Sequence, residues 1–156
     1  MRNCFYIGAG IILAAAASLV NAGAGQAEGV LQPTNPDGVG ALRITPDLIE
    51  LEDNLPRIIK DYTTDDELGV IQMLAPEGWT EPIVSLSFET RGIVLKGTLG
   101  LEFETMTQTF DVDSGFIIPR DTKVRIFNAG EGELHLIEIL RPKYLPTRSQ
   151  QFDSFD

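Results

Sequence analysis

The sequence of 156 residues predicts an all-β protein, a barrel or sandwich built from short strands. Two observations predict this fold class. Apolar and polar residues alternate in one segment after another from residue 84 onward, which is the period of a strand with one buried face. Gly, Pro, Asn and Asp, the residues that favour turns, separate these segments at short intervals.

The predicted strands follow one another through the second half of the chain. They cover residues 84–89, 93–95, 99–104, 110–113, 116–118, 124–127 and 134–140, and residues 68–74 are expected to begin the barrel. Pro119 ends one of them, because proline cannot donate a hydrogen bond to a ladder. We assign residues 68–141 to a single barrel domain.

The segments on either side of the barrel are less regular. Residues 28–67 form an N-terminal arm, which opens on a Gly- and Pro-rich stretch. Within it, residues 44–51 are expected to form a strand that Pro46 confines to a sheet edge, and residues 55–62 form either a helical turn or a strand. Residues 142–156 are a C-terminal tail, expected to be mobile unless it docks on a partner or on the barrel wall.

Residues 1–27 are typical of a signal peptide. A positive start at Arg2 precedes a weakly apolar run and several small-residue cleavage options, of which the one after Ala27 is preferred. The rival interpretation is a retained anchor, but the run is shorter than the roughly 20 residues that a spanning helix needs. We therefore expect export to the periplasm or the medium, with no membrane insertion after cleavage.

Charge and cysteine content exclude several function classes. The net charge of −11, with no basic cluster to offset it, disfavours nucleic acid as a partner. The only cysteine is Cys4, inside the predicted signal peptide. The exported form is therefore expected to have no disulfide and no thiol nucleophile.

The spacing of glycines, a proline and an asparagine resembles that of a known family. Gly78, Gly97, Pro119 and Asn128 stand at the spacings of the two sequence motifs of the cupin superfamily. In those motifs a glycine precedes a His-x-His pair, a glutamate and a second glycine, and the second motif carries a proline, a glycine, a histidine and an asparagine. Asp113 replaces the glycine that usually opens the second motif. The resemblance implies a double-sheet jelly-roll barrel.

The resemblance does not extend to the metal ligands of that family. The ligand positions read Val84, Leu86, Thr90 and Val124, and Asp121 replaces the glycine after the motif proline. The remaining histidine, His135, matches no ligand position, so we interpret it as structural. We expect neither a metal nor another cofactor.

The alternation predicts which side chains face the barrel interior, and these are the candidate ligand-binding residues: Trp79, Val84, Leu86, Phe88, Thr90, Val124 and Ile126. Either they fill the barrel as core, or they line a small apolar cavity with the Thr90 hydroxyl as its one polar group. Trp79 is expected at the mouth, where it would stack on a ligand or pack a loop onto the barrel. The ligand would be a small apolar or sugar-like molecule.

Three functions fit these features. The first is non-catalytic, either small-molecule binding or interaction with a protein. The second is a metal-independent enzyme, an isomerase, epimerase or lyase acting on a sugar or small organic acid, and the third is a structural subunit of an assembly outside the cytoplasm. Acid–base chemistry would need converging titratable groups, and the candidates are expected mostly to face solvent: Glu89, Glu102, Glu104, His135 and Glu138. Two or more ionisable groups inside the barrel would favour the enzyme.

We also expect a homodimer, because the strand at 44–51 suits pairing at a sheet edge.

Overall fold

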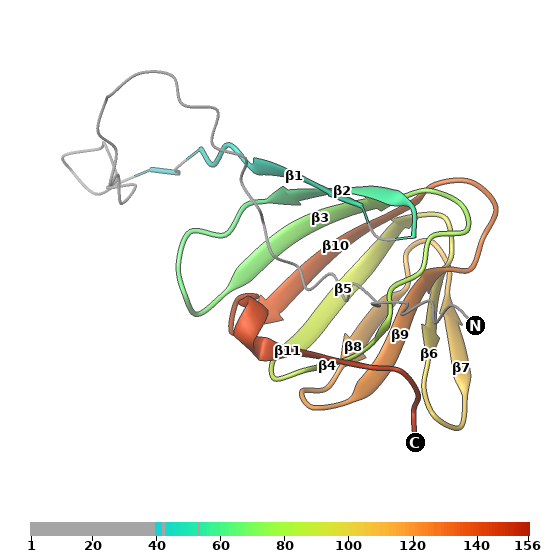
Figure 1. Cartoon of the computed structure of the whole chain (residues 1–156). Helices are drawn as coiled ribbons and strands as arrows, with labels where there is room; N and C mark the ends of the chain where they lie inside the picture. Colours follow the sequence, from blue (N-terminus) through green and yellow to red (C-terminus); the bar gives the residue numbers. More distant parts are fainter. Residues whose placement is uncertain (1–39, 42, 53) are drawn as a thin grey trace, which may run out of the picture.

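Two antiparallel β-sheets form a jelly-roll barrel in the computed structural model, which describes residues 40, 41, 43–52 and 54–156 (Figure 1). The predicted signal peptide lies outside the described residues. The all-β, double-sheet prediction is confirmed. Within the described part of the chain no helix is long and apolar enough to cross a lipid bilayer.

Six strands make the larger sheet and five the smaller one. In spatial order the larger sheet holds β1 (Asp47–Glu52), β2 (Pro56–Asp61), β3 (Gly69–Ala75), β10 (Leu134–Arg141), β5 (Glu89–Lys96) and β8 (Gly115–Ile118). The smaller sheet holds β11 (Ser149–Phe152), β4 (Ile83–Leu86), β9 (Lys123–Asn128), β6 (Leu99–Glu102) and β7 (Thr107–Phe110). One short 3-10 helix, η1 (Pro146–Arg148), precedes β11.

The core lies between the two sheets, where alternate side chains of strands such as β5, β8, β9 and β10 point inward. The inward residues include Met73, Val94, Leu99, Leu101, Phe116, Val124, Leu134 and Leu136, all of them almost inaccessible to solvent. Burying each such side chain stabilises the fold by about 1.5–3 kcal/mol. This core fills the barrel where β6, β8 and β9 approach β5 and β10.

The turns explain why the motif spacing is retained. Gly78 and Gly97 have φ of 76° and 78°, and Asp113 and Asp121, which replace motif glycines, have φ of 67° and 61°. These are left-handed conformations, which glycine adopts freely and aspartate tolerates better than most residues. All four turn positions therefore have a backbone shape that glycine adopts freely.

The expected strand at 84–89 is interrupted. β4 ends at Leu86 and β5 begins at Glu89, and the two strands belong to different sheets. At the bend between them the Ser87 N–H donates to the Arg148 carbonyl at 2.9 Å. Because the bend keeps the phase of the alternation, Phe88 is buried like Val84.

The expected N-terminal strand starts after Pro46, as β1, and lies at the edge of the larger sheet of its own chain. β1 pairs with β2, with Ile49 opposite Ile59. Residues 55–62, for which a helical turn was the alternative, contain strand β2, which pairs with β3.

The C-terminal tail docks on the barrel wall. β11 pairs with β4, with Gln151 opposite Val84, and Figure 1 shows this red strand running beside β4 at the edge of the smaller sheet. The Lys123 ammonium lies 4.3 Å from the centroid of the Phe152 ring and donates to the Phe155 carbonyl at 3.0 Å.

A candidate binding cavity with an ionisable base

A cavity of about 350 Å³ opens between the sheets, at the part of the barrel that the core leaves unfilled. Strands β1, β2, β3, β10 and β5 border it from the larger sheet, and β4, β9 and β11 from the smaller one. Much of its wall is apolar: Ile49, Leu51, Ile59, Ile71, Met73 and Leu140 lie on the side of the larger sheet. Its volume falls at the lower end of the range of small-molecule sites.

Five of the seven predicted site residues border this cavity: Val84, Leu86, Phe88, Thr90 and Ile126. Two do not. Val124, opposite Val84 in the ladder, is fully buried in the core. Trp79 is fully buried as well, so it does not stand at the mouth as expected. Its ring packs beneath Arg57, which explains the difference.

A buried ion pair lies at the base of the cavity. Arg57, on β2, has 5% of its side chain exposed, and its Nη1 donates to Oε1 of Glu81. Glu81 lies between β3 and β4, and its backbone N–H donates to the Ile126 carbonyl at 2.8 Å, which fixes the segment to β9. Arg57 Nη1 also lies 3.5 Å from the Met73 sulfur. The pair thus holds both charges at fixed positions in a site largely shielded from water.

A second carboxyl group faces the same cavity. Glu138 takes an inward position of β10, between Leu136 and Leu140, and is 7% exposed. Burial, and then the negative charge of Glu81, raise the pKa of Glu138 to about 7, while Arg57 opposes the rise. A carboxyl group with such a pKa can gain or lose a proton near neutrality, the property of a general acid or base.

Hydroxyl groups also border the cavity, among them those of Thr90 and Tyr144. Thr90 lies on β5 opposite Leu140 of β10. Its buried Oγ1 has no hydrogen-bond partner within the described residues. Tyr144, in the tail, meets the Phe88 ring edge-on with 6.1 Å between centroids. Burial raises the pKa of Tyr144 to about 12, so its hydroxyl keeps its proton.

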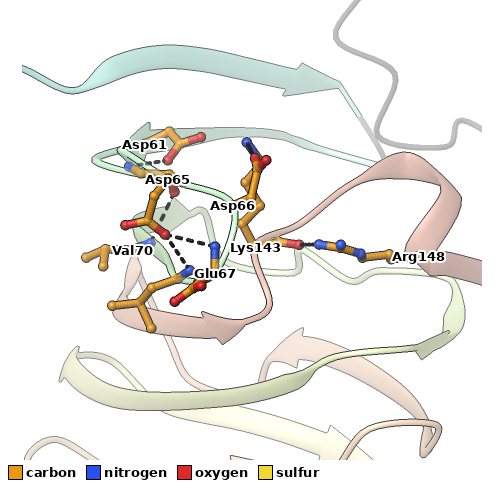
Figure 2. Close-up of polar contacts among 9 residues, drawn as sticks. Asp61, Asp65, Asp66, Glu67, Val70, Lys143 and Arg148 are labelled. Atoms are coloured by element: carbon orange, nitrogen blue, oxygen red, sulfur yellow. Dashed lines mark hydrogen bonds and ion pairs between the residues drawn. The ribbon is translucent and has the colours of Figure 1, made fainter. Parts of the chain in front are cut away.

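A network of polar contacts ties the tail to the loop between β2 and β3, beside the cavity (Figure 2). The Lys143 ammonium pairs with Asp66 at 2.5 Å, and Arg148 Nη1 donates to the Lys143 carbonyl at 2.7 Å. The hydrogen bond that Asp66 accepts from the Lys143 ammonium, and the charge of Lys143, lower the pKa of Asp66. Asp65 accepts two backbone N–H bonds, from Glu67 at 2.8 Å and Leu68 at 2.9 Å, which shapes the loop.

The expectation of a cavity wall made only of alkyl groups and one hydroxyl is therefore wrong, because β2 and β10 supply Arg57 and Glu138 from the larger sheet. Glu138, one of the five titratable candidates of which most were expected to face solvent, is buried instead. A signal was present in the sequence, since Leu134, Leu136 and Leu140 share its inward phase. Arg57 and Glu81 were not anticipated, and no local pattern pairs them.

The other titratable candidates lie away from the cavity. Glu89 pairs with Arg91 at 2.6 Å and Glu102 with Arg125 at 2.9 Å, and Glu104 is exposed. His135 points to the outer side of β10 and does not border the cavity. Within the part of the chain that the structure describes, no group of three or more His, Cys, Asp or Glu side chains could hold a metal ion.

Sequence similarity to known proteins is limited to part of the chain. No protein-family model matches the chain. A protein described as endoribonuclease YbeY from Myxococcus xanthus (strain DK1622) is 31% identical over 84 residues, which are 54% of this chain and 29% of that protein. The chain thus spans less than a third of the length of this curated relative.

Several solved structures are similar to the chain in fold at low sequence identity. A cupin-like protein from Thermotoga maritima matches with a TM-score of 0.56 and 16% identity, covering 65% of this chain and 79% of that one. KdgF from Halomonas sp. matches with a TM-score of 0.54 and 17% identity, over 63% and 87%. An RmlC-like cupin from Methanocaldococcus jannaschii, described as a double-stranded β-helix, matches with a TM-score of 0.52 and 16% identity, over 58% and 83%. The chain therefore has the cupin fold, an RmlC-like jelly roll.

Proposed function

We propose that this protein binds a small organic molecule in the barrel cavity, without a metal. The observation that supports this most is the composition of the cavity: an apolar wall that converges on a few fixed polar groups, Arg57 with Glu81, Glu138 and Thr90. Small-molecule sites typically have this form, in which the apolar wall gives affinity and the polar groups give orientation. A packed core would leave no space of about 350 Å³.

Two variants test this proposal. Leu86→Trp places an indole into the cavity from β4, whereas Leu95→Trp makes the same change at an exposed position of β5. A set of small aromatic and aliphatic compounds is screened by ligand-observed NMR. We expect some to bind the unchanged protein and Leu95→Trp, and to lose binding in Leu86→Trp. Absence of any binder, or equal binding by both variants, contradicts the proposal.

A second candidate is a metal-independent enzyme, which one observation favours specifically. Glu138 has a pKa of about 7 and faces the same cavity as the Arg57–Glu81 pair. A carboxyl group that transfers a proton and a fixed cation that stabilises developing negative charge would suit isomerisation or elimination on a sugar or small organic acid. Hydrogen–deuterium exchange into a bound compound, lost in Glu138→Gln, would establish catalysis. Binding without exchange favours the first function.

Export and metal independence belong to the same proposal. N-terminal sequencing of the exported protein should find cleavage after Ala27, and uncut protein in a membrane fraction would indicate an anchor instead. Elemental analysis after growth in metal-rich medium should find no stoichiometric iron, zinc, nickel or manganese, since Val84, Leu86, Thr90 and Val124 replace the ligands. One equivalent of any of these metals would contradict metal independence.

A further inference from the structure

The charged groups at the cavity are not balanced. Two cations border it, Arg57 and Lys143, and each pairs with an acidic group, Glu81 and Asp66 respectively. Two further carboxyl groups, those of Asp61 and Glu138, border the cavity in addition. Burial and the charges of Glu81 and Arg57 set the protonation state of Glu138. The base of the cavity therefore has a surplus of acidic groups.

This surplus decides which ligand charge the cavity favours. An anionic ligand would meet Glu81 and Glu138, and could bind Arg57 only in competition with Glu81. A cationic ligand would give the buried Glu138 carboxylate a partner. Because a buried charge is costly unless it is paired, one such contact offsets the desolvation of both groups.

The surroundings of Glu138 suit an ammonium group in particular. Thr90, on the neighbouring strand β5, presents a buried hydroxyl oxygen without a partner in the described chain, and this oxygen can accept a second N–H bond. The aromatic pair Phe88 and Tyr144 also borders the cavity, and ring faces attract cations. These groups offer acceptors and aromatic rings to a positive charge.

We propose that the cavity selects a small primary amine, whose ammonium group pairs with Glu138 and Thr90 and whose apolar body packs on the hydrophobic wall. This inference rests on the proposed ligand-binding function. The cavity of about 350 Å³ sets the size of the ligand. At about 30 Å³ for each water-sized atom, it holds on the order of ten non-hydrogen atoms. 2-Phenylethylamine is a suitable probe.

The proposal predicts how binding depends on pH. The titratable and charged groups that border the cavity with Glu138 are Arg57 and Asp61 from β2, Glu81 from the β3–β4 connection, and Lys143 and Tyr144 from the tail. Glu138, with a pKa of about 7, changes charge at neutrality, whereas an alkylamine stays protonated up to about pH 10. Amine binding should therefore tighten from about pH 6 to about pH 8 and release a proton at the lower pH.

The test is calorimetric titration of the purified protein with three probes of similar size that differ in charge: 2-phenylethylamine, 2-phenylethanol and phenylacetate. We expect the amine to bind at least about tenfold more tightly than the other two at pH 8, since a hydrogen bond to a charged group contributes that much or more. Glu138→Gln should remove this advantage, Thr90→Val should reduce it, and Glu104→Gln, which makes the same charge change at an exposed site, should leave it intact.

The outcomes separate this inference from the proposed function. If the alcohol or the acid binds as tightly as the amine, or if Glu138→Gln leaves the preference unchanged while melting normally, amine selectivity is wrong and the binding cavity stands. If none of the probes binds, amine selectivity is wrong as well, and the compound screen with Leu86→Trp decides separately whether the cavity binds ligands. Amine binding that is lost equally in Glu104→Gln would place the site elsewhere and also overturn the inference.

Discussion

The guanidinium of Arg57 lies over the ring of Trp79, with 4.7 Å between Cζ and the ring centroid. Both side chains are buried, and Arg57 also pairs with Glu81. A cation–π contact shielded from water contributes about 2 kcal/mol. The ring beneath the cation and the carboxylate beside it explain how a positive charge persists inside the barrel.

Replacing this arginine should destabilise the protein strongly. Arg57→Met keeps apolar packing on Trp79 but leaves Glu81 in the barrel without its cation, and we expect the free energy of unfolding to fall by about 3–5 kcal/mol. Arg91→Met removes the cation of an exposed pair with Glu89 and should cost less than about 1 kcal/mol. Urea denaturation measures both. Similar losses for the two variants would show that the internal pair does not contribute as described.

The stability of the protein should depend on the ionisation of Glu138. Its pKa rises from 4.5 to about 7 on folding, so the folded state holds a proton that the unfolded state has lost between these values. The contribution of Glu138 to the free energy of unfolding is therefore fully present below pH 4.5. It is lost as pH rises to about 7, and the free energy of unfolding falls by roughly 3 kcal/mol over this range.

Glu138→Gln removes this titration and keeps the shape of the side chain. The free energies of unfolding of the unchanged protein and of Glu138→Gln are measured from about pH 4.5 to about pH 8. Their difference should change between pH 4.5 and about 7 and be constant above about 7. Glu104→Gln serves as the exposed control. A difference that does not vary with pH would mean that the carboxyl is not desolvated.

Adjacent residues of β4 should respond oppositely to a carboxylate. Val84 is 6% exposed and faces Val124 of the core, whereas Ser85 lies opposite Lys123 on the other side of the sheet. Val84→Asp should cost several kcal/mol, because it buries an unpaired charge, and Ser85→Asp should be neutral or slightly stabilising. Equal melting temperatures would show that the register of β4 is shifted by one residue.

The outer face of the larger sheet gives a test of the expected homodimer. Ile93, Ile117 and Ile139 are 49%, 55% and 41% exposed there, which is unusual for β-branched side chains on one face. We expect a second copy to cover them, with a dimer that tightens as salt screens the net charge of −11.

Light scattering coupled to size-exclusion chromatography at two salt concentrations measures the assembly. Ile117→Glu should dissociate the dimer, and Val112→Glu, an equally apolar and exposed position outside this face, should not. A monomer at both salt concentrations would show that this face does not mediate self-association.

Much of the fold could be predicted because its determinants are local. Alternation identified most of the barrel strands, and the left-handed turns at Gly78 and Gly97 fixed their spacing. The strand expected at 110–113 is wrong, because the chain turns after Phe110 and the strand there is β7 (Thr107–Phe110). The docking of the tail could not be predicted, since β11 depends on pairing with β4 from a distant part of the chain. The strand at 55–62 stayed ambiguous for a related reason, as β3 determines its conformation.

The candidate site likewise contains residues that local patterns predict and residues that depend on long-range contacts. Val84, Leu86, Phe88 and Thr90 follow one alternating segment, so their common orientation was predictable, and whether they bind a ligand stays a prediction. The Arg57–Glu81 pair joins residues from two elements through contacts that no local pattern encodes. Glu138 shares the inward phase of Leu134, Leu136 and Leu140, so alternation along β10 could have placed it inside the barrel, although carboxyl groups are seldom buried.

The most direct test of the central claim is a crystal structure of the purified protein with 2-phenylethylamine. The account predicts electron density for the ligand inside the barrel, with its nitrogen within about 2.7–3.2 Å of a Glu138 carboxylate oxygen and its ring against Phe88 and Ile126. A barrel whose interior is closed by its own side chains, with the amine bound elsewhere or not at all, would contradict it.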